Sequence, residues 1–336
     1  MAGEASMVRT GLAVVAMLVA AACGGAAASP TPAATTTPAT VNVGYSEPVA
    51  DNLPLYIASD AGLFSKRNLT ANVQQVTSTQ GIPALLSGQI DIDDIGGSEV
   101  LSAAAQGADL VILGTLTPLN PYSIYVAPGI TSASDLKGKR AAITRPGASL
   151  DIGLHTGLQR LGLDPDKDVT YLSTGSVPNV IAAMLSGQAQ VTVSKPPESL
   201  QLDAKGFKVL MDLSKEKIPA ANTSITARRS WVATHKDVVQ RYIDAIIEGI
   251  AREKRDRSYA LQTLAKWTKS TDDAANLASY NLYSGIVQSL PYSRPEQLAP
   301  AQAQLGKTND KVKNFDLSRL SDSSFIKNAA SRGLGK

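Results

Sequence analysis

The stretch LSGQIDI at residues 86–92 returns as LSGQAQV at residues 185–191, and this repeat decides the fold. In each copy an apolar helical stretch ends at the glycine, the residue that most readily adopts the left-handed conformation that stops a helix, and a β-rich run follows. Similar lead-ins, TSTQG at 77–81 and STGS at 173–176, precede the two copies. The order helix, glycine, strand is common in α/β proteins. Four identical letters within matching flanks nevertheless favour a duplicated lobe.

Outward from the repeat, β-rich runs alternate with helical stretches. The first series has expected strands at 41–45, 71–76, 90–95 and 110–116, and helices at 54–61, 82–86 and 98–106. The second has strands at 139–143, 169–172 and 190–193, and helices at 149–161, 177–185 and 196–205. A strand at 225–228 and helices at 235–254, 258–267 and 272–287 follow. The alternation predicts α/β sheets with mostly parallel neighbours. We assign residues 41–126 plus 214–336 to lobe I and residues 127–213 to lobe II.

The first forty residues are expected to lie outside the fold. Residues 1–22 have the pattern of a signal peptide, because the apolar run at 12–19 is far shorter than the roughly 20 residues that span a membrane. Cys23 follows small residues and resembles the lipidated cysteine of a bacterial lipoprotein; the alternative is a plain signal peptide in which Cys23 is incidental. Residues 23–40 read as the lipidated cysteine with a flexible linker, since residues 24–40 contain only Ala, Gly, Thr, Pro and Ser. We therefore expect an exported protein, held by lipid on the outer face of the cytoplasmic membrane, at the cell surface or in the periplasm.

Composition excludes several functions. Cys23 is the only cysteine of the 336 residues, and there are two histidines, so disulfide frameworks, thiolate zinc sites and Cys/His nucleophile pairs are excluded. A net charge of +3 with basic residues spread along the chain argues against nucleic acid. Asp91, Asp93 and Asp94 suggest a metal site, but closely spaced acids on one strand more often pair or cap. We therefore expect that the protein is not an enzyme and that it binds no cofactor and no metal.

Several motifs resemble a known family. The sequence LPLYIA at 53–58 followed by GLF at 62–64 resembles the opening of periplasmic binding proteins of the sulfonate, nitrate and taurine type, a group that includes relatives of the thiamine-pyrimidine precursor binders. SGQID at 87–91, GGS at 96–98 and DLKGK at 135–139 follow in the family's order. The resemblance implies a type II periplasmic-binding-protein-like fold, with two α/β lobes joined by a two-strand hinge. It also implies a monomer that delivers solute to the permease and ATPase of an ABC transporter.

The candidate ligand-binding residues follow strands or begin helices. Ligands of open parallel sheets sit beyond the carboxyl ends of the strands, near helix N-termini that favour anions. These positions predict contacts from Tyr45, Ser46, Ser78, Gly97, Ser98, Thr117, Arg145, Ser149, Thr174 and Lys195. Arg145 and Lys195 would supply positive charge from the second lobe. In the alternative interpretation Ser98 and Ser149 are helix N-caps, Tyr45 covers the sheet, and the two cations lie on the surface.

The sequence therefore predicts an extracytoplasmic solute-binding lipoprotein. It would capture a small anionic organic solute, similar to a sulfonate, nitrate or carboxylate, and deliver it to an ABC importer. Ser194-Lys195-Pro196 departs from the family, whose members commonly place an aromatic residue, an acid and a proline there. Two alternatives stay open: a solute sensor for a signalling partner, and a binder of a thiamine-pyrimidine-like heterocycle. An enzyme of the same fold is disfavoured, because the related synthases use a cysteine- and histidine-rich stretch. The membrane is expected to be contacted only through lipid.

Overall fold

The structure is a computed structural model that describes residues 37–336. The expected signal peptide, the lipidation site Cys23 and most of the expected linker lie outside the described residues. Strand β1 (Ala39–Tyr45) begins within the expected linker, because its first two residues already pair with β2 (Leu69–Gln75). The expected linker boundary at residue 40 is therefore too late.

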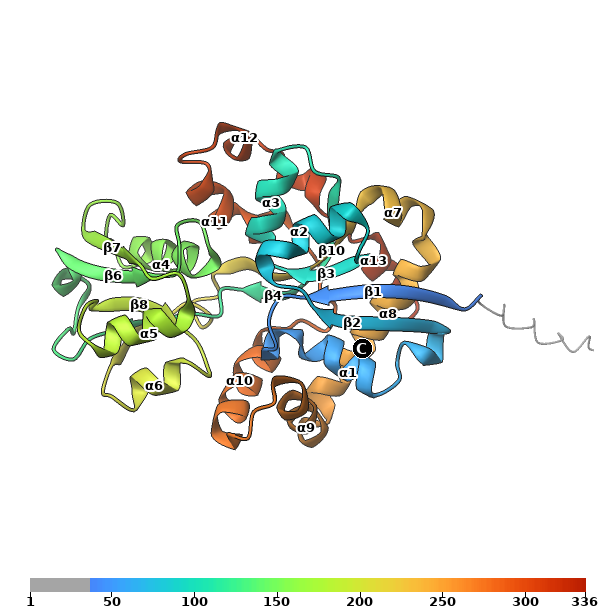
Figure 1. The fold of residues 1–336 in the computed structure, drawn as a ribbon, viewed down its shortest axis with the longest axis horizontal. Coiled ribbons are helices and arrows are strands. Elements are labelled where there is room, and N and C mark those ends of the chain that lie inside the picture. Colours follow the sequence, from blue (N-terminus) through green and yellow to red (C-terminus); the bar gives the residue numbers. More distant parts are fainter. Residues whose placement is uncertain (1–36) are drawn as a thin grey trace, which may run out of the picture. The chain divides into compact units, whose positions relative to one another are not determined.

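The first sheet has five strands in the order β2-β1-β3-β10-β4 (Figure 1). Its further strands are β3 (Ile92–Ile95), β4 (Leu110–Leu119) and β10 (Pro219–Arg228). β1 runs parallel to β2 and β3, whereas β10 is antiparallel to β3 and β4. Its two faces hold separate apolar cores, one with α1 (Leu53–Asp60) and α8 (Lys236–Arg255), the other with α2 (Ser78–Ser87) and α3 (Gly97–Ala105).

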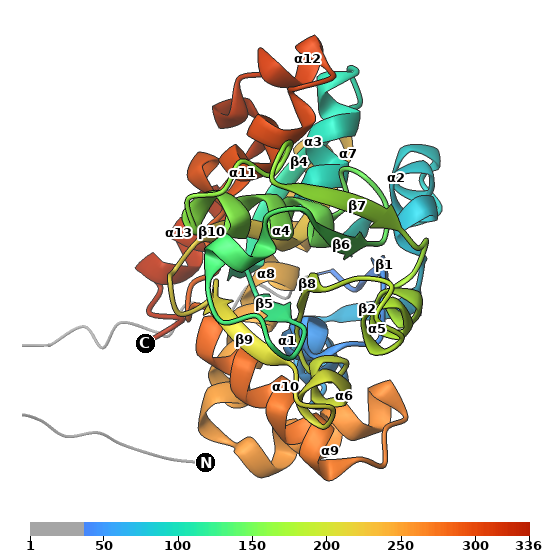
Figure 2. The same cartoon turned by 90° about the vertical axis from the view of Figure 1, so that its left-hand side faces the viewer.

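The second sheet repeats this arrangement in the order β7-β6-β8-β5-β9. Its strands are β5 (Ser123–Val126), β6 (Lys139–Ile143), β7 (Val169–Ser173), β8 (Val191–Ser194) and β9 (Lys208–Asp212). Figure 2 shows α4 (Ser149–Arg160) on one side of this sheet, and α5 (Val177–Leu185) and α6 (Ser199–Asp203) on the other. β6 is parallel to β7 and β8, and β5 is antiparallel to β8 and β9. The duplication that the repeat predicts is thus present at the level of strand order.

Two expectations about the sheets are wrong. The sheets are mixed rather than mostly parallel, because each carries an antiparallel strand, β10 or β5, beside its parallel trio. β5 also belongs to the second sheet, although the expected boundary between residues 126 and 127 placed it in lobe I. We refer below to the first sheet with its helices as the first lobe, and to the second sheet with its helices as the second lobe.

The remaining described helices belong mostly to the C-terminal part of the first lobe. They are α7 (Arg229–Thr234), α9 (Arg257–Thr268), α10 (Asp273–Ile286), α11 (Pro295–Leu305), α12 (Asp310–Lys313) and α13 (Ser324–Ser331). Short 3-10 helices are η1 (Ala50–Asn52), η2 (Ser65–Arg67), η3 (Ala133–Leu136) and η4 (Leu317–Leu320). The isoleucines of α8 lie in the first core and are at most 1% exposed, as the apolar stripe predicts. Within residues 37–336, every helix is too short or too polar to cross a membrane.

The chain crosses between the sheets twice, after β4 and after β9. The two crossings are hydrogen-bonded to each other, since the Asn120 N–H donates to the Ile218 carbonyl at 2.8 Å and the Leu213 N–H donates to the Tyr122 carbonyl at 3.0 Å. Two paired strands of this kind are the hinge that a type II binding fold requires. Hinges of this kind allow two lobes to close around a ligand.

Candidate ligand-binding site

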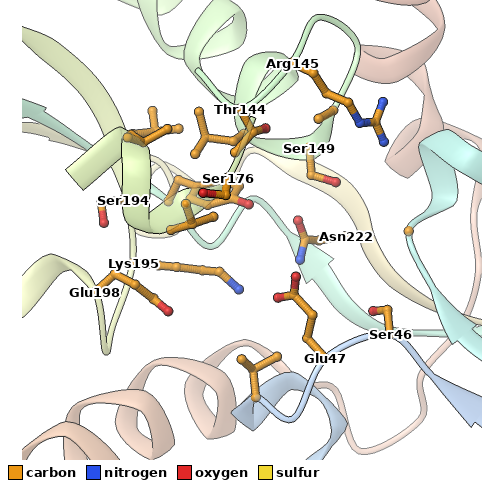
Figure 3. Close-up of a pocket in the computed structure, with 18 of the residues that line it drawn as sticks. Ser46, Glu47, Thr144, Arg145, Ser149, Ser176, Ser194, Lys195, Glu198 and Asn222 are labelled. Carbon is orange, nitrogen blue, oxygen red and sulfur yellow. The ribbon is translucent and has the colours of Figure 1, made fainter. Parts of the chain in front are cut away.

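A cavity of about 430 Å³, called the cleft below, is lined by residues of both lobes (Figure 3). The first lobe contributes Ser46, Glu47, Val49, Asp51, Gly96, Glu99, Asn222 and Thr223. The second lobe contributes Tyr122 of the hinge, the ends of β6 and β8, and the starts of α4 and α5. The volume suits a small molecule, because pockets for such ligands typically hold roughly 300–1,000 Å³.

Two helices of the second lobe begin at the cleft. The N-cap of α4 is Ala148, so no side chain caps the first turn of that helix. The hydroxyl of Ser176 caps α5 by accepting from the Asn179 N–H at 3.4 Å. Free N–H groups and the helix dipole give such an end a partial positive charge, which stabilises a bound anion. This wall of the cleft therefore favours negative charge.

Lys195 follows β8 and reaches across the cleft to the first lobe. Its ammonium donates a hydrogen bond to the hydroxyl of Tyr283 on α10, and lies 5.8 Å from the ring centre of Tyr122 and 5.1 Å from that of Tyr283. Burial lowers the pKa of a lysine, but the Tyr283 oxygen and the Asp51 carboxylate outweigh burial here and raise the pKa of Lys195. Lys195 therefore stays positively charged.

Arg145 lies at the end of β6 and forms an ion pair between the lobes. Its guanidinium is 3.5 Å from the carboxylate of Glu99 on α3, and 53% of its side chain is exposed. The Ser98 hydroxyl donates to the same carboxylate at 2.7 Å. Because Arg145 is half in water and already paired, it offers a ligand less net charge than Lys195 does.

Asp51 is a buried acid in the wall of the first lobe. It is 9% exposed, and its Oδ2 accepts a hydrogen bond from the Thr223 hydroxyl at 2.6 Å. Its Oδ1 has no hydrogen-bond partner among the described residues. Nearby, partial burial in the cleft raises the pKa of Glu47, while the Lys195 ammonium acts in the opposite direction. The first lobe therefore lines the cleft with the acids Glu47, Asp51 and Glu99 and with no basic residue.

Seven of the ten predicted binding residues fall into three groups. Ser46, Arg145, Ser149 and Lys195 line the cleft. Gly97 and Thr174 lie one residue from the lining glycines, Gly96 and Gly175. Ser78 begins α2, and its side chain lies outside the described residues.

Three other predicted residues do not line the cleft. Tyr45 packs edge-on against Tyr56 and Trp267, with ring centres 5.4 and 6.0 Å apart, so it covers the sheet as the alternative interpretation has it. Thr117 is 1% exposed and is paired with Thr223 between strands β4 and β10. Ser98 instead lines a smaller pocket beside the hinge. Strand alternation and helix rotation direct these side chains away from the cleft.

Sequence reasoning missed the acids of the cleft. Glu47 follows Ser46 directly at a strand end, so the rule that selected Ser46 could have found it. Asp51 lies in η1 and is held by Thr223 of the distant strand β10, which no local pattern reveals. Within residues 37–336, no group of three or more His, Cys, Asp or Glu side chains is placed to hold a metal ion.

Residues 50–255, more than half of the chain, match the model of the family described as NMT1/THI5 like. The chain belongs to the NMT1/THI5-like family. YtlA of Bacillus subtilis, which carries the name of a binding protein, is 25% identical over 199 residues, or 57% of this chain and 60% of YtlA. An Escherichia coli protein named for binding aliphatic sulfonates is 26% identical over 239 residues, or 68% of this chain and 72% of that protein.

Solved structures agree on the fold of this NMT1/THI5-like chain. The periplasmic aliphatic sulphonate binding protein SsuA from Escherichia coli matches with a TM-score of 0.69 at 24% identity, over 87% of this chain and 100% of SsuA. The enzyme DszB, solved as a point mutant in complex with biphenyl-2-sulfinic acid, matches with a TM-score of 0.66 at 19% identity, over 88% and 99% of the two chains. The expected periplasmic-binding-protein fold is thus confirmed.

Proposed function

We propose that this protein is an extracytoplasmic solute-binding protein that captures a small solute in the cleft and delivers it to an ABC importer. The observation that carries the proposal is the cleft itself, which is lined from two duplicated lobes that a hydrogen-bonded hinge joins. A ligand held there would contact both lobes at once. Closure of two lobes around a solute is how such a fold can signal occupancy to a partner.

The ligand in this proposal carries an anionic group. The uncapped start of α4, the start of α5 and Lys195 all line the cleft from the second lobe, and all three favour negative charge. The names of relatives that bind sulfonates support the same class of solute.

The proposal includes no catalysis. His155 is buried against Tyr171, with ring centres 4.9 Å apart, and His235 stacks on Trp231, so neither histidine lines the cleft. Cys23 is the only cysteine of the chain and precedes the described fold. The DszB match shows that this fold also supports an enzyme, so the proposal depends on the cleft's residues rather than on the fold.

The remaining parts of the proposal concern location. A lipid on Cys23 would hold the folded domain outside the cytoplasmic membrane through the uncharged segment 24–40. The partners would be the permease and ATPase of the importer, and the binding protein would act as a monomer.

The experiment joins binding to closure. Gln89→Cys and Gln188→Cys place one label on each lobe, at equivalent exposed positions of the repeat, in a Cys23→Ser background that leaves no other thiol. A panel of small sulfonates, carboxylates, nitrate and their amino derivatives is then screened for changes in label-to-label energy transfer and in thermal stability. We expect one solute to shorten the distance between labels and, at ~100 times its dissociation constant, to stabilise the fold by ~2.7 kcal/mol.

A solute that binds tightly without changing the distance between the labels would contradict capture by closure. Turnover of a bound solute into a new compound would contradict the absence of catalysis. Two labels on one lobe, at Gln89 and Lys66, give the control distance that closure leaves unchanged.

A further inference from the structure

The side chain of Lys195 joins the two lobes. Its backbone follows β8 of the second lobe, and its ammonium donates a hydrogen bond to the hydroxyl of Tyr283 on α10 of the first lobe. The ring centre of Tyr122, in the core of the second lobe, lies 5.8 Å from the ammonium, and that of Tyr283, in the core of the first, lies 5.1 Å from it. The ammonium is therefore within cation–π range of both cores.

Tyr283 offers this ammonium a fixed and neutral acceptor. It is 3% exposed and packs in the first core, so its hydroxyl is held in place. Burial raises the pKa of Tyr283 and outweighs the opposing effect of the Lys195 charge, so the phenol keeps its proton. A lysine ammonium has three N–H donors. Because Lys195 lines the cleft, the bond to Tyr283 orients the other two donors for groups that enter there.

Ion pairs also join the lobes, but they are exposed to water. Arg145 and Glu99 pair at 3.5 Å with side chains that are 53% and 20% exposed, and Lys307 and Asp166 pair at 2.6 Å with side chains that are 37% and 55% exposed. Such pairs contribute little to stability because water screens them. The bond from Lys195 differs, since its acceptor is buried and its loss would leave a partly buried ammonium without a partner.

We propose that Tyr283 is a positioning residue that holds the Lys195 ammonium across the cleft and thereby keeps the two lobes together before a solute enters. Opening of the lobes separates the two groups and returns the ammonium to water. The strength of this one bond then sets how often the cleft opens to solution, and the same lysine serves as latch and as ligand-binding group. The inference goes beyond the proposed function and rests on it only in requiring lobes that open and close.

The test measures opening in the protein alone. Ser194 lines the cleft and is 4% exposed, so a thiol introduced by Ser194→Cys, in the full chain with Cys23→Ser, reacts with a bulky maleimide when the lobes open. We expect Tyr283→Phe to raise the rate of labelling by about tenfold, as the loss of one charge-assisted hydrogen bond allows. In a Lys195→Met background the same change should alter the rate by less than about twofold, because no ammonium remains to be held.

Two control variants separate opening from a general loss of stability. Tyr280→Phe is the matched control, because Tyr280 lies on the same helix and its hydroxyl donates to the Glu253 carbonyl at 3.0 Å. This variant loses a buried hydrogen bond far along the helix from the Lys195 contact, and its thiol should be labelled as slowly as that of the parent. Lys307→Met removes the exposed ion pair with Asp166 and should raise the rate by about twofold at most.

The outcomes that overturn the inference are specific. Unchanged labelling in Tyr283→Phe overturns it, and so does an increase of the same size in the Lys195→Met background. Equal increases in Tyr283→Phe and Tyr280→Phe also overturn it, since they would report lost stability rather than opening. Because these measurements use no solute, their failure leaves the proposed function intact, whereas a panel in which no solute binds would contradict the proposed function alone.

Discussion

Asp93 gives the sharpest prediction about stability. Its carboxyl has no exposed area, and neither of its oxygens has a hydrogen-bond partner among the described residues. Gly44 and Gly81 flank it so closely that a Cβ on either glycine would collide with the carboxyl. Burial raises the pKa of Asp93 from 3.8 to about 7.

The sign of the pH dependence follows from this shift. Between pH 3.8 and about 7 the folded chain binds the Asp93 proton and the unfolded chain does not, so stability falls as the pH rises through that window. The loss in the free energy of unfolding that the Asp93 charge causes is about 4 kcal/mol above pH 7 and vanishes below pH 3.8. Asp93→Asn keeps the size of the side chain and removes the charge. We therefore expect the variant to match the wild type at pH 4 and to exceed its free energy of unfolding at pH 8 by about 2–4 kcal/mol.

Urea unfolding at the two pH values measures this difference. The only two tryptophans, Trp231 and Trp267, pack against the core of the first lobe, so their fluorescence reports on the lobe that contains Asp93. Asp91→Asn is the matched control, because Asp91 accepts a hydrogen bond from the Asn42 N–H at 2.9 Å. We expect this variant to be less stable than the wild type at both pH values. A difference between Asp93→Asn and the wild type that is the same at pH 4 and pH 8 would refute the reasoning.

Three further predictions concern other groups. Lys195→Ala should weaken binding of the solute by about tenfold or more. Arg145→Ala removes a cation that is half-exposed and already paired, so it should weaken binding by about threefold or less. Titration calorimetry measures both affinities. Glu253 is 1% exposed, and its carboxylate has no hydrogen-bond partner among the described residues. Because burial raises the pKa of Glu253 to about 8, Glu253→Gln should raise the thermal midpoint of unfolding at pH 9 but not at pH 5. Cys23→Ser should move the protein from the membrane to the soluble fraction on centrifugation, and unchanged membrane association would contradict lipidation at that residue.

The sequence predicted the parts of the fold that local patterns encode. The helix–glycine–strand repeat appears as α2 with β3 and as α5 with β8, and Gly88 and Gly187 adopt φ values of 80° and 76°. The expected helix at 177–185 and strand at 139–143 match α5 and β6. These elements depend on nearest neighbours along the chain, which a sequence displays directly.

Long-range pairing was harder to predict. SIYV at 123–126 reads as a continuation of the first lobe, and only its hydrogen bonds to β8 and β9 assign it to the second. In the site, Ser46 and Lys195 follow strand ends and were found, but Asp51 depends on Thr223, which is 172 residues away in sequence. The acidic wall of the cleft is thus a product of tertiary structure.

Hydrogen exchange, measured by mass spectrometry with and without the solute that the panel identifies, tests capture between the lobes most directly. We predict slower exchange in both lobes at once, in peptides that cover residues 46–51 and the starts of α4 and α5. Protection confined to one lobe, or to a surface away from these segments, would contradict it.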